Sequence, residues 1–322
     1  MDTYLQLITG YLNDIPLTKE PKNLYEPVAY SLANGGKRIR PVMTLLACEM
    51  FNGDVNEALP AAAGLELFHN FTLLHDDIMD DAPIRRNKPT VHVKWDDNTA
   101  ILSGDVLFAI ASQHVSKVPD NKLRHVLDLF YQTVKEICEG QQYDMDFETM
   151  DTVPVDTYLH MIRLKTAVLP AACLQTGAII AGADPEDQEK IYRFGEQVGM
   201  AFQIRDDWLD TFGDEGQFGK KTGGDILANK KTWLYVQALE QADNQQREEL
   251  LTLFKDNGKI PDQDKISRVK AIYERLNLNN RALEAMEAYY AAAFDVFQQI
   301  DVPDDRKRNL ENMTKNLLNR DK

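Results

Sequence analysis

The sequence contains few cysteines, and their spacing excludes two kinds of stabilising site. Its 322 residues include only Cys48, Cys138 and Cys173, with no Cys-x-x-Cys pair. Such an odd and scattered set provides neither a disulfide framework nor the ligands of structural zinc. The N-terminus also lacks the basic segment that begins a signal peptide. We therefore expect a protein of a reducing compartment, namely the cytoplasm.

Positive charge is also in short supply. The chain has 36 Lys and Arg residues against 51 Asp and Glu residues, a formal net charge of −15. An acidic protein repels nucleic acid and anionic lipid over most of its surface, so nucleic acid is not an expected partner. The cations that are present form short groups at 37–40, 85–86 and 220–221. These groups indicate local binding of an anion.

Long apolar runs are nearly absent. One stretch, residues 166–183, has no charged residue over 18 positions, which is the lower limit for a membrane span. It contains Pro170 and Gln175, and about half of it is Ala or Gly. We therefore expect a tightly packed core helix and no stable membrane insertion.

Alternating runs of β-branched residues are also nearly absent, whereas helical periodicity is widespread. We expect helices over 60–79, 123–147, 188–210, 232–254 and 282–300, separated by Gly- and Pro-containing breaks. None of the breaks is a long linker. The sequence therefore predicts one all-α domain over residues 1–322.

Two clusters of aspartate are the strongest chemical signal. Asp76, Asp77 and Asp80 end one apolar helix, and the same Asp-Asp-x-x-Asp spacing recurs in the segment IRDDWLD. Carboxylates four residues apart share one helix face and repel each other. A divalent cation compensates that repulsion most simply. If the two clusters face each other across a bundle, they line one pocket with carboxylates.

Oxygen ligands without histidine are typical of magnesium rather than zinc. Magnesium binds few protein carboxylates and completes its shell with water and substrate phosphates. A substrate with a diphosphate or triphosphate is therefore expected. ATP is not, because the Gly-x-x-x-x-Gly-Lys-Ser/Thr loop is absent.

Six motifs in order carry a resemblance that covers nearly the whole chain. They are GGKRIRP (35–41), DDIMDDAPIRR (76–86), GQQYDM (140–145), KT (165–166), FQIRDDWLD (202–210) and GKKTGGDILANKKTWL (219–234). The sequence resembles trans-isoprenyl diphosphate synthases of the farnesyl and geranylgeranyl type. One departure is Asn87, where many members have glycine after the arginine pair.

The resemblance implies the isoprenoid synthase fold, a bundle of long antiparallel helices around a deep central cavity, and a homodimer. It implies three magnesium ions per active site, for which manganese can substitute. It also implies an enzyme that transfers prenyl groups: an allylic diphosphate (C5, C10 or C15) ionises, its cation alkylates isopentenyl diphosphate, and a proton is eliminated.

The resemblance also assigns roles to individual residues. The metal ligands correspond to Asp76, Asp77, Asp80, Asp206, Asp207 and Asp210. The groups that hold the allylic diphosphate correspond to Arg85, Lys165, Thr166, Gln203, Lys220 and Lys230, and those for isopentenyl diphosphate to Lys37, Arg40, His69 and Arg86. Arg38 is expected to be structural or on the surface, and Lys230 rather than Lys231 is expected to contact substrate.

Three residues of the helix before Asp76 are predicted to set product length: Phe68, Phe71 and Thr72. Phe71 lies five residues back, about 7.5 Å along the helix, where an aromatic residue resembles the short-chain enzymes. Thr72 is small where animal-type farnesyl synthases carry a second aromatic residue. We predict a C15 to C20 product and favour geranylgeranyl diphosphate, with a farnesyl diphosphate synthase that stops at C15 as the alternative.

Two other functions are weighed against this one. A class I terpene cyclase shares the first aspartate motif but needs no isopentenyl site, and it makes hydrocarbon from an allylic diphosphate alone. A non-catalytic partner subunit usually lacks one aspartate motif, and a purified homomer with activity excludes it. Both motifs are present, so the synthase is favoured.

Overall fold

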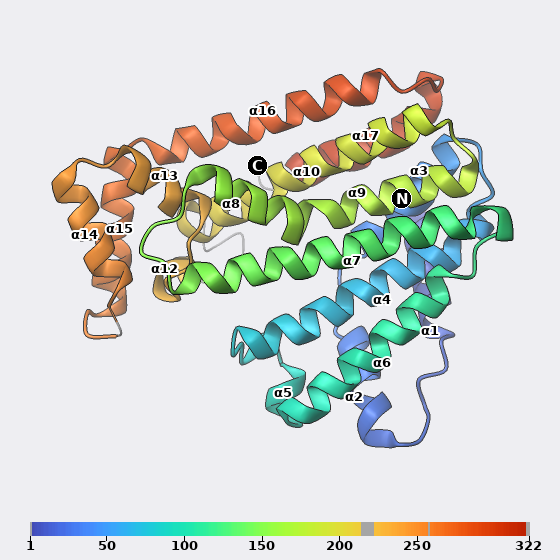
Figure 1. Ribbon diagram of the computed structural model, residues 1–322, viewed down its shortest axis with the longest axis horizontal. Helices are drawn as coiled ribbons and strands as arrows, with labels where there is room; N and C mark the ends of the chain where they lie inside the picture. Colours follow the sequence, from blue (N-terminus) through green and yellow to red (C-terminus); the bar gives the residue numbers. More distant parts are fainter. Residues whose placement is uncertain (1, 214–221, 257, 320–322) are drawn as a thin grey trace. The chain divides into compact units, whose positions relative to one another are not determined.

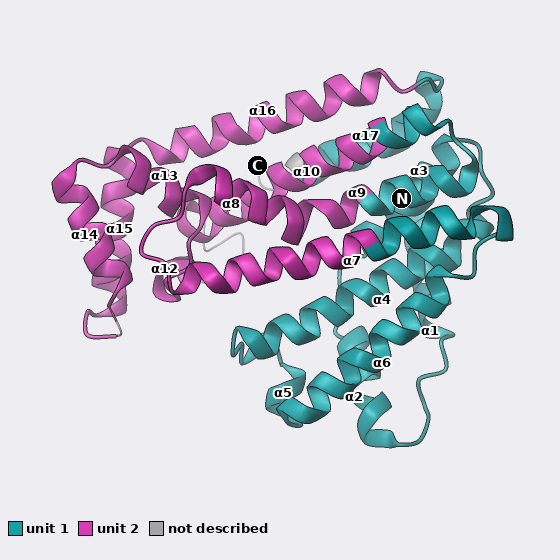
Figure 2. Ribbon diagram, in the orientation of Figure 1, with its two compact units in different colours: residues 1–131, 172–189, 301–317 teal, residues 132–171, 190–300, 318–322 magenta. Residues whose placement is uncertain are grey.

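The computed structural model describes residues 2–213, 222–256 and 258–319, which are almost entirely helical (Figure 1). The all-α prediction is confirmed. The chain divides into two compact units, coloured separately in Figure 2. The first comprises residues 1–131, 172–189 and 301–317, and the second residues 132–171, 190–300 and 318–322. A single domain over 1–322 stays a prediction.

Each unit is described by its own elements. The first unit contains α1 (Asp2–Asn13), α2 (Lys22–Ala33), α3 (Ile39–Met50), α4 (Val55–Met79), β1 (Ile84–Arg85), β2 (Lys88–Pro89), α5 (Val91–Lys94) and α6 (Asp97–Val115). The second contains α8 (Val155–Ile162), the π-helix η1 (Arg163–Ala167), α12 (Gly224–Leu227), α13 (Trp233–Gln241), α14 (Asn244–Phe254), α15 (Asp262–Arg275) and α16 (Leu278–Gln298). The boundary falls inside α7 (Asp120–Glu148), α9 (Val168–Ala181), α10 (Pro185–Phe212) and α17 (Asp304–Asn319).

Helix α4 packs against α3 and α6 in the first unit. Asp54 begins it, because the side chain of Asp54 accepts a hydrogen bond from the backbone of Asn56 at 2.9 Å. A Cβ added to Gly64 would lie 2.6 Å from the side chain of Val115, so glycine allows α4 and α6 to approach closely. Most of the residues from Ala58 to Phe68 are buried. The buried helix predicted at 60–79 is confirmed.

A short hairpin follows α4 and is the one sheet among the described residues. Strands β1 and β2 pair antiparallel, and Arg86 and Asn87 form the turn with φ angles of 52° and 61°. Positive φ at both central residues is the type I′ pattern, which suits a tight hairpin. The hydroxyl of Tyr30 fixes the outgoing strand by donating to the carbonyl of Pro89 at 2.8 Å.

The second unit has its own aromatic core. Tyr158, Tyr235 and Tyr273 are among its fully buried side chains. The prediction of one helix over 232–254 is wrong, because α13 ends before Asp243 and α14 begins after it. The carboxylate of Asp243 accepts from the backbone of Gln246, whose side chain accepts from the backbone of Asp243 in return. This capping box satisfies the donors of a new helix start.

The most apolar helical segment, Val155–Ala181, is long and apolar enough to cross a membrane by length and composition alone. Of its most apolar window, 72% is buried inside the protein. A core helix buried in this way is what the sequence predicts for residues 166–183.

Candidate active site

The first acidic cluster (Asp76, Asp77 and Asp80) occupies the C-terminal end of α4. Asp76 is partly exposed and Asp80 is exposed, whereas Asp77 is buried. Asp80 caps the helix by donating its backbone N–H to the carbonyl of Asp76 at 2.8 Å. The C-terminal end of a helix carries partial negative charge, so carboxylates there are electrostatically unfavourable. Their accumulation at this end indicates a site for cations.

Asp77 turns inward and holds an arginine of the hairpin. Its Oδ1 accepts a hydrogen bond from Nε of Arg85 at 2.6 Å. Burial raises the pKa of Asp77, and the neighbouring Arg85 opposes part of that rise. The sequence places both residues at a ligand, whereas the structure pairs them with each other. Asp77 thereby positions Arg85.

Arginines gather around the half-buried His69 in the same unit. His69 Nε2 lies 3.0 Å from Nη1 of Arg40, and because an arginine only donates, the imidazole accepts. Burial, and then the charges of Arg40, Arg86, Arg85 and Arg38, hold the pKa of His69 well below its usual value. His69 is therefore neutral at neutral pH. Four positive charges around a neutral imidazole favour an anion at this place.

Arg40 retains a donor for such an anion. Its Nε is buried and has no hydrogen-bond partner among the residues that the structure describes. A buried charged donor without a partner is costly, and a bound phosphate oxygen relieves that cost.

The loop that carries Lys37 is fixed by hydrogen bonds of two arginines, Arg38 and Arg86. Nη1 of Arg38 donates to the buried Glu66 at 2.5 Å, and Nη2 donates to the carbonyl of Leu32 at 2.8 Å. Arg86 donates to the carbonyl of Gly35 on the same loop. The expectation that Arg38 is structural is confirmed. Lys37 itself is exposed.

The chain-length residues belong to an aromatic cluster. The rings of Phe68 and Phe71 are 5.8 Å apart, and Phe108 of α6 lies 6.1 Å from Phe68 and 5.3 Å from Phe71. Phe130 of α7 lies 5.4 Å from Phe68. Thr72 donates its hydroxyl to the carbonyl of His69 at 2.9 Å. Sequence reasoning missed Phe108 and Phe130, because no local motif marks which rings of distant helices meet α4.

In the second unit, Lys165 and Thr166 lie in the π-helix η1. Such single-turn π segments widen the helix locally and are frequent at functional sites. Lys165 Nζ donates to Oδ2 of Asp144 at 2.5 Å. A Cβ on Gly140 would lie 2.4 Å from the backbone nitrogen of Lys165, so this glycine of GQQYDM lets α7 pass close to η1. Asp144 is the partner that sequence reasoning missed.

A hydrogen-bonded chain joins η1 to the second acidic cluster (Asp206, Asp207 and Asp210). Thr166 donates to Oε1 of Gln203 at 2.9 Å, and Gln203 donates to Oδ1 of Asp207 at 2.9 Å. The other oxygen of Asp207 accepts from the hydroxyl of Tyr158 at 2.5 Å and from the backbone of Trp233 at 2.7 Å. The two oxygens of this buried carboxylate thus receive three protein hydrogen bonds.

Asp207 consequently positions its neighbours. Burial raises its pKa to about 6, while the three hydrogen bonds oppose that rise. Its role as a metal ligand stays a prediction. Asp206 is exposed and Asp210 partly exposed, so the outward carboxylates of this cluster are the first and third, as in the first cluster.

A fourth carboxylate joins the second cluster. The backbone N–H of Asp225 donates to Oδ2 of Asp210 at 3.0 Å. Burial, followed by the charges of Asp210 and Asp207, raises the pKa of Asp225 to about 7, and Lys230 opposes the rise. Asp225 was not predicted, although it stands in the quoted motif GKKTGGDILANKK. Only its contact with Asp210 across 15 residues reveals it.

These side chains line a cavity of about 140 Å³ in the second unit. The lining includes Lys165, Thr166, Gln203, Asp207, Asp225 and Lys230. Lys231 lines it as well, so the lining of this cavity does not show which of the two adjacent lysines contacts substrate. Lys220 lies outside the described residues.

The predicted residues thus fall into two groups, each described within its own unit. The first unit brings together Arg40, His69, Arg85, Arg86 and the first acidic cluster, and the second brings together Lys165, Thr166, Gln203, Lys230 and the second acidic cluster.

The donor atoms suit magnesium. In the described ranges no three His, Cys, Asp or Glu side chains converge to hold an ion by themselves. Magnesium needs only one or two carboxylates when phosphate oxygens and water complete its shell. Crowded carboxylates at helix ends, with basic groups beside them, define a class of all-α enzymes that bind diphosphates through divalent ions.

Comparison with known proteins narrows this class. A profile of the polyprenyl synthetase family matches residues 21–276, so the chain belongs to this family. A short chain isoprenyl diphosphate synthase of Methanocaldococcus jannaschii is 42% identical over 75% of this chain and 73% of its own length. A geranylfarnesyl diphosphate synthase of Natronomonas pharaonis is 40% identical over 70% of this chain and 72% of its own length.

A solved structure agrees with the sequence comparisons. Geranylgeranyl pyrophosphate synthetase from Pyrococcus horikoshii matches 98% of this chain and 95% of its own chain, with 34% identity and a TM-score of 0.91. The resemblance predicted from the motifs is therefore confirmed. The protein is a prenyltransferase of a family that uses divalent metal to ionise a diphosphate.

Proposed function

We propose that this protein condenses isopentenyl diphosphate with allylic diphosphates of C5, C10 and C15, and that its main product is geranylgeranyl diphosphate. The observation that carries the proposal is the presence of two groups of basic side chains, one in each unit and each beside its own acidic cluster. Two cationic groups suit a reaction with two diphosphate substrates. The second candidate product is farnesyl diphosphate.

We further propose that the acidic clusters bind diphosphate through magnesium, with three ions per active site and manganese as a substitute. Asp76, Asp80, Asp206 and Asp210 would hold the metal, with Asp77 and Asp207 in support. Magnesium held by these carboxylates would neutralise charge that develops on the leaving diphosphate. The carboxylate pairs at helix ends support this assignment.

The side chains of this protein contribute binding and orientation. The allylic diphosphate is held by Arg85, Lys165, Thr166, Gln203, Lys220 and Lys230. Isopentenyl diphosphate is held by Lys37, Arg40, His69 and Arg86. When the carbon–oxygen bond breaks, its electron pair leaves with the diphosphate, whose charge the fixed cations stabilise. The allylic carbon then bonds to the terminal double-bond carbon of isopentenyl diphosphate. Loss of a proton from the adjacent methylene forms the new double bond.

The growing chain needs a dry apolar wall, because water quenches the allylic cation. Phe68, Phe71 and Phe108 supply such a wall beside α4. We propose that Phe71 limits the chain, with Phe68 and Thr72 as further determinants.

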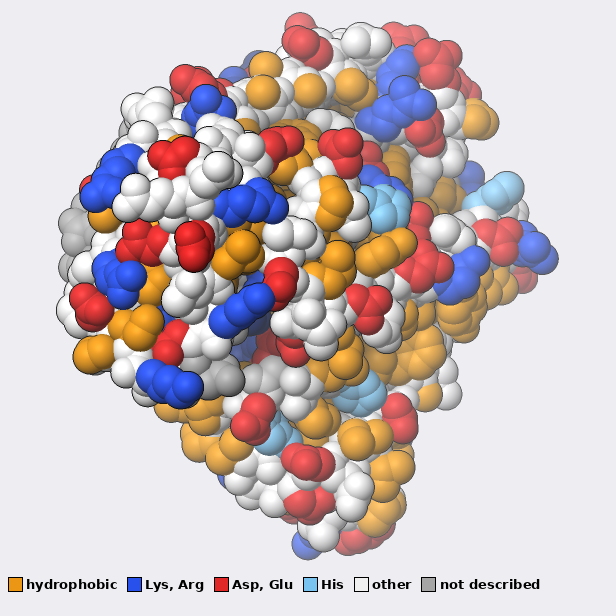
Figure 3. Space-filling model, turned by 60° about the vertical axis from the view of Figure 1, so that its left-hand side comes forward, with side chains coloured by type: hydrophobic (Ala, Val, Ile, Leu, Met, Phe, Trp, Pro, Cys, Tyr) orange, Lys and Arg blue, Asp and Glu red, His pale blue; other side chains and the backbone are white. Residues whose placement is uncertain are grey.

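We also propose a cytoplasmic homodimer. Helix α6 exposes Ile101 and Leu102, and α5 exposes Val93. Their exposed fractions are 42%, 58% and 53%. Figure 3 shows hydrophobic side chains collected on part of the surface, beside areas where acidic and basic side chains are mixed. A second copy of the chain would cover exposed apolar residues of this kind.

Product analysis tests the function. The purified protein is incubated with magnesium, isopentenyl diphosphate and each allylic starter, and products are measured by mass. We expect C20 product from each starter, no reaction after chelation of the metal, and recovery when magnesium is added. Hydrocarbon formed without isopentenyl diphosphate would show a cyclase instead. Inactivity of the homomer would show a partner subunit.

Aspartate variants test the sites. Asp80→Asn and Asp206→Asn are each expected to lower kcat about 100-fold or more, the loss typical when a group that stabilises developing charge is removed. Asp81→Asn is the matched control, because Asp81 is exposed and lies outside the proposed ligand set. Equal activity of Asp80→Asn and Asp81→Asn would contradict the assignment.

A further inference from the structure

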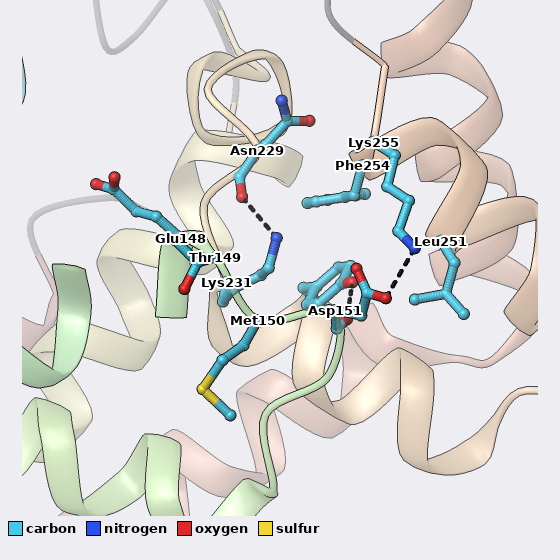
Figure 4. A pocket seen from close by; sticks show the side chains of 10 residues that line it. Glu148, Thr149, Met150, Asp151, Asn229, Lys231, Leu251, Phe254 and Lys255 are labelled. Atoms are coloured by element: carbon cyan, nitrogen blue, oxygen red, sulfur yellow. Dashed lines mark hydrogen bonds and ion pairs between the residues drawn. The ribbon is translucent and has the colours of Figure 1, made fainter. Parts of the chain in front are cut away.

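The second unit contains another cavity, of about 240 Å³, which the proposed reaction does not use. Figure 4 shows it beside the end of α7 and against α14. Its lining includes Glu148 at the end of α7, Asp151 of the following segment, Lys231, and Leu251 and Phe254 of α14. The cavity therefore combines charged groups with apolar walls, as small-molecule sites do.

Lys231 is the buried cation of this cavity. It is only 9% exposed, and its Nζ lies 5.0 Å from the ring centre of Tyr235 and 5.5 Å from that of Phe254. Among the described residues, its ammonium donates one hydrogen bond, to the carbonyl of Asn229 at 3.2 Å, and contacts no carboxylate at ion-pair distance. The dashed line in Figure 4 marks this bond.

Lys265 supplies a second buried ammonium, which contacts the same asparagine, Asn229, as Lys231. Lys265 is 3% exposed, and its Nζ donates to Oδ1 of Asn229 at 2.6 Å and lies 5.9 Å from the ring centre of Phe254. Burial lowers the pKa of both Lys231 and Lys265. Two ammonium groups that share one amide residue are expensive to bury, and an anion nearby reduces that cost.

We propose that this cavity is a second anion site, which binds a small anion of the phosphate class through Lys231. Its volume corresponds to about eight water molecules at ~30 Å³ each, which is room for a phosphate with part of its hydration shell. Lys255 adds a cation at the rim, where it is paired with Asp151 at 2.7 Å. Glu148 and Asp151 limit the negative charge that the cavity accepts, so inorganic phosphate binds better than diphosphate.

The site is coupled to the catalytic cavity through the chain itself. Lys231 lines both cavities, and its neighbour Lys230 lines the catalytic one. An anion that draws Lys231 toward the second cavity therefore changes the position of the Lys230 side chain. Phosphate consequently alters KM for the allylic diphosphate.

Calorimetric titration with inorganic phosphate, and separately with pyrophosphate, tests this site. The titration is done in chelator, so that the proposed metal-dependent site does not take up the anion. We expect millimolar or tighter phosphate binding that Lys231→Met weakens about tenfold or more, the effect of losing a charged hydrogen bond. Lys259→Met, an exposed nearby lysine outside the lining, is the control and keeps full affinity.

Asp151→Asn serves as a variant that leaves the buried lysines in place. It removes a negative charge from the lining and frees Lys255, so phosphate affinity rises several-fold. Absence of phosphate binding by the wild type, or unchanged affinity in Asp151→Asn, would overturn the proposal. Loss of binding in Lys230→Met but not in Lys231→Met would also overturn it, by placing the anion in the catalytic cavity. Binding in chelator does not depend on whether the protein makes a C20 product.

Discussion

Single residues within each Asp-Asp-x-x-Asp motif have opposite environments. Asp77 and Asp207, the second residue of each pair, are 6% and 4% exposed and accept hydrogen bonds from the protein. Asp80 and Asp206 are exposed. Successive helical residues lie about 100° apart, so adjacent aspartates point in different directions, whereas the first and last residues of the motif, four apart, differ by only about 40°. The motif therefore provides an inward carboxylate that fixes neighbours and outward ones for ligand.

Removal of one ring should lengthen the product. Phe71→Ala opens space beside Phe108, whose ring centre lies 5.3 Å away, so we expect product at least one C5 unit longer than wild type. Mass analysis of products from a C15 starter measures this. Tyr131→Ala, which removes an exposed ring, is the control and leaves product length unchanged. If Phe71→Ala also gives the wild-type product, Phe71 does not limit the chain.

Elements of this fold are fixed by local polar contacts at their ends. Asp54 begins α4, and Asp243 separates α13 from α14. The hairpin turn is fixed differently, by backbone conformation, since Arg86 and Asn87 both have positive φ. Asn tolerates this conformation better than other residues with a side chain, which explains why it stands where glycine is frequent.

The hairpin turn provides a matched pair of variants. Asn87→Gly should keep or slightly raise the free energy of unfolding, because glycine adopts positive φ without steric cost. Asn87→Val should lower it by about 1–2 kcal/mol, since a β-branched residue is strained in the left-handed region. Chemical denaturation measures both. Equal stability of the two variants would show that the turn relaxes to another conformation.

The contact between α1 and α6 predicts that the free energy of unfolding depends on pH. Burial, assisted by Lys117, lowers the pKa of His114 to about 4, and Nδ1 of His114 lies 3.1 Å from the hydroxyl of Tyr11. Between pH ~6.5 and about 4 the unfolded chain binds this proton and the folded chain does not. The stability associated with neutral His114 is therefore present above pH 6.5 and is lost as pH falls toward 4.

His114→Gln tests this dependence, because glutamine does not titrate. Between pH 6.5 and 4 the wild type should lose about 1–2 kcal/mol more unfolding free energy than the variant, a value reduced for partial solvent screening. Thermal or urea unfolding at both pH values measures the difference. Parallel pH profiles of the two proteins would contradict the assignment.

At the scale of the whole molecule, charge and apolar surface are unevenly placed. The net charge is −15, yet four arginines surround His69 in one unit and Lys165 and Lys230 line a cavity in the other. Local cations in an acidic protein attract a diphosphate without attracting polyanions generally. Apolar residues exposed on α5 and α6 suggest contact with a second copy of the chain.

A single charge on that surface should disrupt the dimer. Leu102→Glu places a carboxylate in the exposed apolar group of α6, so we expect a monomer of half the wild-type mass by light scattering. Leu283→Glu on α16 is the control, because Leu283 is 38% exposed and lies on another helix. A dimer that persists in Leu102→Glu would place the interface elsewhere.

Most of the helices could be predicted from the sequence, because periodicity is a local property. The helices expected at 123–147 and 188–210 lie within α7 and α10. The break at Asp243 was missed because no Gly or Pro marks it between Trp233 and Phe254, and only the reciprocal bonds with Gln246 show that the backbone starts a new helix. Asp225 was missed for a similar reason, since its significance lies in a contact with Asp210.

The sequence by itself determined the helical class, the two aspartate motifs and the family, because spacing and residue type express these within short segments. Only the tertiary structure decided which carboxylates face inward, which rings join Phe71, and that Asp144 pairs with Lys165. These features depend on contacts between residues far apart in the chain. Burial and hydrogen bonding are set there by packing, which local sequence does not encode.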